Sequence, residues 1–170
     1  ATWEAVRDAP LAELAQAIRP GGLAAVKAPR IQAVLRTLTD SSGHVGLPDL
    51  THMRRKRALE LLLSLPGVGR KTAACVLLFG ARVPAIPVDT HVHRVSLRFG
   101  LVPPRTNPDH ACDMLEAALP PPDYYAFHVN LIRLGRDICK AVRPGCAVCP
   151  LRLKCAYANG SPRLTLTPNA

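Results

Sequence analysis

Apolar residues recur every three or four positions along most of the chain, which is the spacing of an α-helix with one buried face. In the first such stretch Leu11, Leu14 and Ile18 share a face, and Asp8 stands where a helix N-cap is expected. A second amphipathic stretch extends over about 28–38 and ends at polar and glycine residues. The pattern predicts two helices near the start of the chain.

The helical spacing continues through the later part of the chain. Helices are expected at 90–99 behind the N-cap residue Asp89, at 107–120 and at 123–139. The segment 82–88 is apolar but contains two prolines, which lack the N–H that a central strand must donate. We therefore predict an all-α fold.

The sequence LPGVGRKTA at 65–73 lies between two apolar helical stretches and predicts a hairpin that joins two helices. Gly67 and Gly69 are expected to adopt backbone conformations closed to other residues and to leave no side chain in the way. The turn would then present N–H groups to a phosphate oxygen, near the positive end of the following helix. A plain helix–helix turn explains the same glycines, so the hairpin alone leaves both interpretations open.

Lys71 occupies an unusual position for a lysine. It falls in the first turn of the second helix, where the helix dipole disfavours a cation. The same field favours the neutral amine, which is a nucleophile that forms Schiff bases with carbonyl-like carbons. The position is unfavourable for stability and useful for chemistry, so Lys71 is a candidate catalytic residue.

Composition and charge narrow the choice of partner. Hydrophobic residues make up 48% of the chain and charged residues 20%, which is typical of a folded protein. The net charge of +10 favours a polyanionic partner, above all nucleic acid. A membrane surface is the weaker alternative, and no apolar stretch is long enough to span a membrane. The basic cluster at 54–57 fits a solvated helix face and a DNA flank equally well.

Four of the six cysteines are crowded into a stretch of 17 residues, which favours a metal site over disulfides in a chain without a secretion signal. They are Cys139, Cys146, Cys149 and Cys155. Four thiolates suit either zinc or an iron–sulfur cluster, so the residues themselves leave the metal open. Cys75 and Cys112 lie on apolar helix faces and are expected to be core thiols.

Two motifs together carry a family resemblance. LPGVGRKTA at 65–73 and VDTHVHRV at 88–95 resemble endonuclease III, the bifunctional branch of the helix-hairpin-helix DNA glycosylases, and the likeness extends over about 11–157. The resemblance implies that Lys71 attacks C1′ of a nucleotide flipped out of the duplex. It also implies that Asp89 deprotonates this lysine or stabilises the developing positive charge of the sugar. A helix N-cap is the alternative role for Asp89, and one carboxylate can fill both roles.

The resemblance also assigns a cofactor and contacts to DNA. The cysteine spacing is that of the family's [4Fe–4S] loop, and zinc remains the alternative. Leu23 aligns with a leucine that wedges into the duplex, although a core residue is the alternative, and His91 matches a histidine that lines the lesion pocket. Independently of the resemblance, the cations of the cysteine loop, Arg143 among them, suit it to hold phosphate, with solubility as the alternative role. The expected DNA-binding residues are Leu23, Gly67, Val68, Gly69, Arg70, His91 and Arg143.

By the same resemblance, residues 8–122 should form a glycosylase lobe built as a helical barrel, packed against a smaller lobe at 123–157 that carries the cluster. Residues 158–170 should form a flexible tail. This sequence departs from the family pattern at two places. Family members have further helices before the position of Leu23, and one of these helices bears a glutamine. They also have a histidine at the position of Leu134.

The function implied is base-excision repair. We expect a monomeric DNA glycosylase with AP lyase activity that removes oxidised pyrimidines from duplex DNA and cleaves at abasic sites. Its expected location is the nucleoid of a prokaryotic cytoplasm. Two alternatives are a monofunctional mismatch glycosylase, which Lys71 argues against, and a DNA-binding paralogue without turnover, which the departure before Leu23 suggests.

Overall fold

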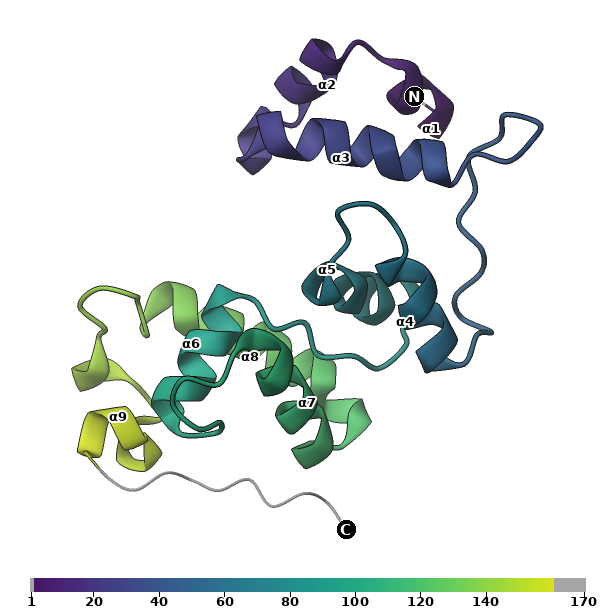
Figure 1. Cartoon of the computed structure of the whole chain (residues 1–170). Coiled ribbons are helices and arrows are strands. Elements are labelled where there is room, and N and C mark those ends of the chain that lie inside the picture. The colour runs from purple at the N-terminus through teal and green to yellow at the C-terminus, as the bar shows by residue number, and fades with distance from the viewer. Residues whose placement is uncertain (1, 161–170) are drawn as a thin grey trace. The chain divides into compact units, whose positions relative to one another are not determined.

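The computed structural model describes residues 2–160, and the regular structure in this range is helical (Figure 1). Within these residues the β-pairing consists of one isolated antiparallel bridge between Thr39 and Val45. The prediction of an all-α fold is confirmed. In this described range, no helix combines the length and the apolar character needed to cross a membrane.

The elements fall into two compact units that divide between Gly69 and Arg70. In chain order they are α1 (Trp3–Asp8), α2 (Leu11–Ala17), the 3₁₀ turn η1 (Arg19–Gly21), α3 (Ala24–Thr37), α4 (Arg55–Leu63), α5 (Arg70–Cys75), the π-helical turn η2 (Val76–Ala81), α6 (Thr90–Phe99), α7 (Pro108–Ala118), η3 (Pro121–Asp123), α8 (Tyr124–Asp137), η4 (Cys146–Val148), η5 (Arg152–Lys154) and α9 (Ala156–Asn159).

The first unit is organised around α3, which packs against α1 and α2. Leu14 and Leu35 are buried in this unit, together with the polar side chain of Gln32. The Gln32 Nε2 amide donates a hydrogen bond to the carbonyl oxygen of Ala9 at 2.7 Å, so its burial is compensated. This bond ties α3 to the connection between α1 and α2.

Two expectations for the first unit are wrong in detail. Asp8 does not cap α2; it ends an additional helix, α1, and its carboxylate binds the guanidinium of Arg7 at 2.6 Å. Pro10 takes the N-cap position of α2 instead. The second helix also begins at Ala24, four residues earlier than expected, because Leu23 starts it from a left-handed backbone conformation without a side-chain cap.

The second unit has its core between α6, α7 and α8, and α6 contacts both of the other helices (Figure 1). The chain enters this core along the extended segment after η2, whose residues 85–88 are all buried. The core residues are Leu78, Ile86, Val88, Val92, Val102, Ala111, Cys112, Leu115 and Tyr124. Cys112 is thus a core thiol, as expected, and its Sγ lies 3.3 Å from the carbonyl oxygen of Ile86.

A close approach between α6 and α8 occurs at Gly135. A Cβ atom at this position would lie only 2.9 Å from Cβ of His91, a distance that real Cβ atoms do not tolerate. The glycine therefore lets the helix that begins at Asp89 pack tightly on α8. Both helices have nearly the extents that the sequence predicts, since α6 spans 90–99 and α8 spans 124–137.

The packing bears on the expected lobes. Helix α8, in the segment 123–157, packs against α6, and α9 also contacts α6. The two compact units divide between Gly69 and Arg70. The division into lobes at 122 and 123 stays a prediction. Of the expected tail, residues 158 and 159 belong to α9, while 161–170 lie outside the described residues.

Candidate catalytic and nucleic-acid site

The hairpin turn has one glycine that its conformation requires. Gly67 has a φ of +74°, and a Cβ there would also lie 3.0 Å from Cδ of Arg30. The N–H of Val68 donates to the carbonyl oxygen of Leu65 at 3.1 Å and closes the turn. Gly69 does not have a positive φ, so the expectation of an unusual conformation there is wrong; no heavy atom lies within 4 Å of its Cβ position.

Lys71 and Asp89 are each placed by a helix start. Lys71 is the second residue of α5 and its side chain is exposed. Asp89 is half-buried and caps α6: its Oδ1 accepts hydrogen bonds from the N–H groups of His91 at 2.9 Å and Val92 at 2.8 Å. The predicted N-cap is confirmed, and these two bonds fix the direction of the carboxylate.

A third residue of this site, His128 on α8, was not identified from the sequence. The residue is 2% exposed, and its Nδ1 lies 2.8 Å from the carbonyl oxygen of Pro87. Burial lowers the pKa of His128, and the nearby cation of Lys71 lowers it further, whereas the Pro87 hydrogen bond and the charge of Asp89 raise it. The charges of Lys71 and Asp89 therefore both act on the pKa of one buried imidazole.

The sequence holds a weak signal for His128. It lies four residues after the buried Tyr124 and seven before the buried Gly135, so it belongs to the buried face of α8. A lone histidine on such a face is ordinarily a core residue, and its partner Pro87 is 41 residues away in the chain. Only the tertiary packing reveals what this histidine contacts.

Arg70 and His91, both expected to contact DNA, are bound to protein groups. The Arg70 guanidinium binds both carboxylate oxygens of Asp113 on α7, and this hydrogen bonding raises the pKa of Arg70 above its usual value. His91 accepts a hydrogen bond at Nδ1 from Nη2 of Arg94 at 3.1 Å, because a guanidinium can only donate. A neutral His91 therefore carries its proton on Nε2.

Leu23 and Arg143 share an unusual backbone conformation. Their φ values are +55° and +51°, in the left-handed region that is unfavourable for residues with side chains. Leu23 is 75% exposed in front of α3, and Arg143 is exposed on the cysteine loop. Leu23 and the hairpin residues 67–69 belong to the first unit, whereas the other expected site residues belong to the second.

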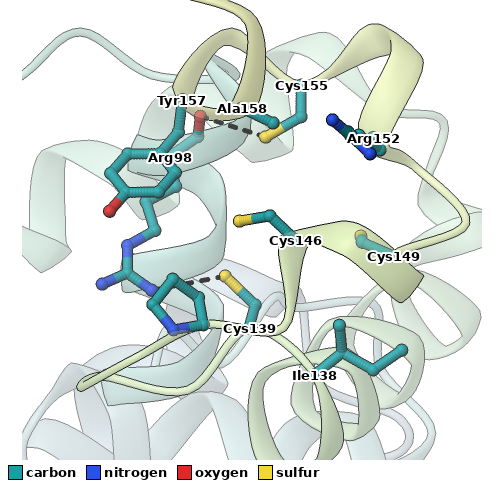
Figure 2. Close-up of a pocket in the computed structure, with 10 residues that line it drawn as sticks. Arg98, Ile138, Cys139, Cys146, Cys149, Arg152, Cys155, Tyr157 and Ala158 are labelled. Atoms are coloured by element: carbon teal, nitrogen blue, oxygen red, sulfur yellow. Dashed lines mark hydrogen bonds between the residues drawn. The ribbon is translucent and has the colours of Figure 1, made fainter.

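The four clustered cysteines line one pocket, and Figure 2 shows sulfur atoms turned toward the space between them. All four are half-buried free thiols. Within residues 2–160, no three cysteine, histidine or carboxylate side chains lie close enough together to bind a single metal ion. The structure thus gathers the predicted ligands at one place without the tight spacing of a one-ion site.

Arg98, on the last turn of α6, holds the cysteine loop. Its guanidinium donates to the carbonyl oxygens of Lys140 at 2.6 Å and Ala141 at 2.9 Å, and it lies 3.5 Å from Sγ of Cys139 (Figure 2). The same guanidinium stacks over the ring of Tyr157, 5.0 Å from its centre. The helix that Asp89 caps therefore ends in contact with the cysteine pocket.

The glycine hairpin between helices places the chain in the class of helix-hairpin-helix proteins. The model of one family, described as HhH-GPD superfamily base excision DNA repair protein, matches residues 1–121. The chain belongs to this superfamily.

Individual relatives agree with this assignment. Endonuclease III of Thermotoga maritima is 39% identical over 145 residues, and endonuclease III of Bacillus subtilis is 40% identical over 146 residues. These alignments cover 85% and 86% of this chain, which spans 63% of the length of each relative. A solved structure of a trapped covalent endonuclease III–DNA intermediate matches with a TM-score of 0.78 and 37% identity, covering 94% of this chain and 70% of that one. The resemblance to endonuclease III is confirmed.

Proposed function

We propose that the chain is a DNA glycosylase with AP lyase activity that uses Lys71 as its nucleophile. The observation that carries the proposal is that Lys71 stands in the first turn of α5 and that Asp89 caps α6, its Oδ1 held by the N–H groups of His91 at 2.9 Å and Val92 at 2.8 Å. The related structure named as a trapped covalent intermediate with DNA supports a covalent reaction. The whole activity is a proposal for this chain because it spans only part of its relatives.

In the proposed reaction the attacking group is the Nζ amine of Lys71 after it has given up a proton. Its Nζ forms a bond to C1′ of the flipped nucleotide while the bond from C1′ to the damaged base breaks, and the departing base takes up a proton. Opening of the sugar ring then gives the Schiff base. Asp89 takes the proton that the amine loses, or balances the positive charge that develops on the sugar as the base leaves.

DNA contacts form the second part of the proposal. The turn 67–69 and Arg70 are proposed to hold phosphate, Leu23 to enter the duplex, and His91 to donate from Nε2 to the lesion. Arg143 is proposed to hold phosphate from the cysteine loop. The proposed substrate is duplex DNA with oxidised pyrimidines or abasic sites, bound by a monomer at the nucleoid of a prokaryotic cell.

We also propose that the cysteine pocket holds a [4Fe–4S] cluster through Cys139, Cys146, Cys149 and Cys155. One zinc ion requires four sulfurs at about 2.3 Å from a common centre. A four-iron cluster instead takes one thiolate on each iron, and the four cysteines that line the pocket would supply these four thiolates. When bound, the cluster would tie the loop into a fixed shape next to Arg98.

Colour and metal content test the cluster. Protein made with iron available should be yellow-brown, with a broad absorption at the blue end of the visible range and about four irons per chain. Cys146→Ser should lower the iron content and the soluble yield together, because a metal tether contributes folding free energy. Cys75→Ser, outside the loop, should keep the colour. Colourless protein with one zinc per chain would overturn the assignment.

Borohydride trapping tests the catalytic proposal. Mixed with duplex DNA that contains an abasic site, the protein should form a stable adduct with borohydride, since hydride reduces the imine to an amine. Lys71→Gln and Lys71→Arg should both bind this DNA and form no adduct, because neither side chain offers a neutral amine. Full trapping by Lys71→Gln would exclude Lys71 as the nucleophile. Binding without trapping by the unaltered protein would instead favour a monofunctional glycosylase or a DNA-binding protein without turnover.

A further inference from the structure

We infer that His128 is a positioning residue for Asp89, which it holds in place through the carbonyl oxygen of Pro87. The inference rests on the proposed function, since it concerns the carboxylate that assists base excision. His128 lies on α8 and Asp89 caps α6, so the hydrogen bond from His128 to Pro87 links α8 to the segment that leads into α6.

The backbone of the segment that leads into Asp89 is held by hydrogen bonds to side chains of other elements. Residues 82–88 form neither helix nor strand, so their backbone groups must bind elsewhere. The N–H of Ile86 donates to Oε1 of Glu116 at 2.9 Å. The carbonyl oxygen of Pro87 accepts from Nδ1 of His128 at 2.8 Å. Two side chains thus fix two successive residues immediately before Val88 and Asp89.

The His128 ring is itself held firmly. Its side chain is buried, and the ring of Phe79 meets it edge-on at a centroid distance of 5.5 Å and an interplanar angle of 61°. A carbonyl oxygen can only accept, so Nδ1 of His128 carries the proton. The hydrogen bond therefore has a fixed donor in a fixed place, which is what a positioning group needs.

The charge of the ring matters for the same step. Burial and the nearby Lys71 both lower the pKa of His128, so they favour the neutral ring. A positive imidazolium beside Asp89 would offset the carboxylate's charge and reduce its stabilisation of a developing sugar cation. A neutral His128 holds the backbone before Asp89 and leaves the carboxylate's charge available.

A histidine that merely satisfies the core would affect both steps of the reaction equally. A positioning role for Asp89 affects excision of a damaged base, which passes through a sugar cation, more than trapping at a preformed abasic site, where an aldehyde is already present. The ratio of the excision rate to the trapping rate distinguishes a positioning role from a core role. A general loss of folded protein lowers both rates by the same factor and leaves their ratio unchanged.

The test compares three substitutions at this position. In His128→Asn the amide nitrogen stands near the place of Nδ1 and can still donate to Pro87. In His128→Gln the amide lies near the place of Nε2, and His128→Leu has no donor at all. Rates are measured for excision from duplex DNA with one oxidised pyrimidine and for borohydride trapping on the same duplex with an abasic site.

We expect His128→Gln and His128→Leu to lower the ratio of excision to trapping about ten- to a hundredfold, and His128→Asn to restore most of it. His93→Leu is the matched control, because it removes a histidine–carbonyl bond of 2.7 Å to Thr106 in the same unit. That variant should keep the ratio of the unaltered protein.

An unchanged ratio in His128→Gln would overturn the inference, and so would a loss in His128→Asn equal to that in His128→Gln. If His128→Leu does not fold, the comparison of Asn with Gln still decides. Absence of trapping by the unaltered protein is a different result, because it contradicts the proposed function before any substitution is made.

Discussion

Asp89 joins a structural and a proposed chemical role in one side chain. Its Oδ1 receives two N–H groups of the first turn of α6, so the carboxylate points in a direction that the helix sets. The cap stabilises the helix and at the same time orients the charge. The two roles can be separated by a substitution that keeps the acceptor and removes the charge.

Asp89→Asn makes this separation. The amide oxygen can still cap α6, so the free energy of unfolding should fall by at most about 1 kcal/mol. Excision of a damaged base should fall by roughly a hundredfold or more, because the developing sugar cation loses its counter-charge. Cleavage at a preformed abasic site should fall less. Asp123→Asn, just before α8, is the control and should change neither rate. Equal losses in both reactions of Asp89→Asn would contradict this role.

The sequence was sufficient to place Lys71 and Asp89 at helix starts, since caps, dipoles and motif spacing are local properties. The role of His128 could not be predicted from the sequence, because it depends on a hydrogen bond to Pro87, which is 41 residues away. At Gly69 the sequence instead predicted too much: the motif suggested an unusual backbone conformation, but Gly69 does not have a positive φ. Properties that depend on neighbouring residues can be predicted from the sequence, whereas contacts with residues distant in the chain cannot.

Burial of His128 predicts a pH dependence of stability. Its pKa is lowered in the folded protein, so below about pH 6.5 the unfolded chain binds a proton that the folded chain does not. Stability contributed by this residue is present above pH 6.5 and is lost as the pH falls toward the folded-state pKa, by up to about 1.4 kcal/mol per pH unit.

Urea unfolding at pH 7.5 and 5.5 measures this effect. The unaltered protein should lose more stability on acidification than His128→Asn, which has no imidazole to protonate at this position. His110→Gln, which replaces an exposed histidine, should keep the acid response of the unaltered protein. Identical acid responses in the unaltered protein and in His128→Asn would show that burial of His128 does not set the response.

At the scale of elements, α6 is the connecting piece of the second unit. It is capped by Asp89, packs along α8, and in its last turn carries Arg98, which binds the cysteine loop. Its bounds were predictable because Asp89 and Gly100 mark both ends chemically. The start of α3 could not be predicted from a capping residue, because Leu23 at the N-cap position makes no side-chain cap hydrogen bond.

Gly135→Ala should separate α6 from α8. The added Cβ would lie 2.9 Å from Cβ of His91, so the helices must move apart or strain. We expect a loss of about 1–3 kcal/mol in unfolding free energy, although alanine favours helices over glycine by about 1 kcal/mol. Circular dichroism during urea unfolding gives this value.

Gly80→Ala is the matched control in the same unit. Its Cβ would lie 3.9 Å from Cγ1 of Val76, an ordinary contact, so its stability should stay the same or rise. If Gly135→Ala were as stable as Gly80→Ala, the tight approach of α6 and α8 at Gly135 would be wrong.

At the scale of the whole molecule, the described chain divides within its most informative motif. The boundary between Gly69 and Arg70 falls inside LPGVGRKTA at 65–73, so the hairpin belongs partly to each compact unit. The family resemblance implies a lobe boundary at 122 and 123, and that division stays a prediction. Within the second unit, the packing of α6 against α8 joins helices that are separate in the sequence.

The net charge of +10 belongs to this scale as well, and it predicts a steep salt dependence of DNA binding. A handful of phosphate contacts from the hairpin and the cysteine loop gives a slope of roughly −3 to −6 when the logarithm of affinity is plotted against the logarithm of salt concentration, because each contact releases counterions. Fluorescence anisotropy with undamaged duplex in sodium chloride measures the slope.

Arg143→Gln tests whether the cysteine loop contributes to that slope. Removing one phosphate contact should make the slope less negative by about 0.9 and weaken binding to all sequences alike. Arg36→Gln removes an exposed arginine of α3 that is not among the expected DNA contacts, so it should leave the slope unchanged. An unchanged slope in Arg143→Gln would remove this residue from the interface. A flat salt dependence of the unaltered protein would mean that its positive charge serves something other than binding DNA.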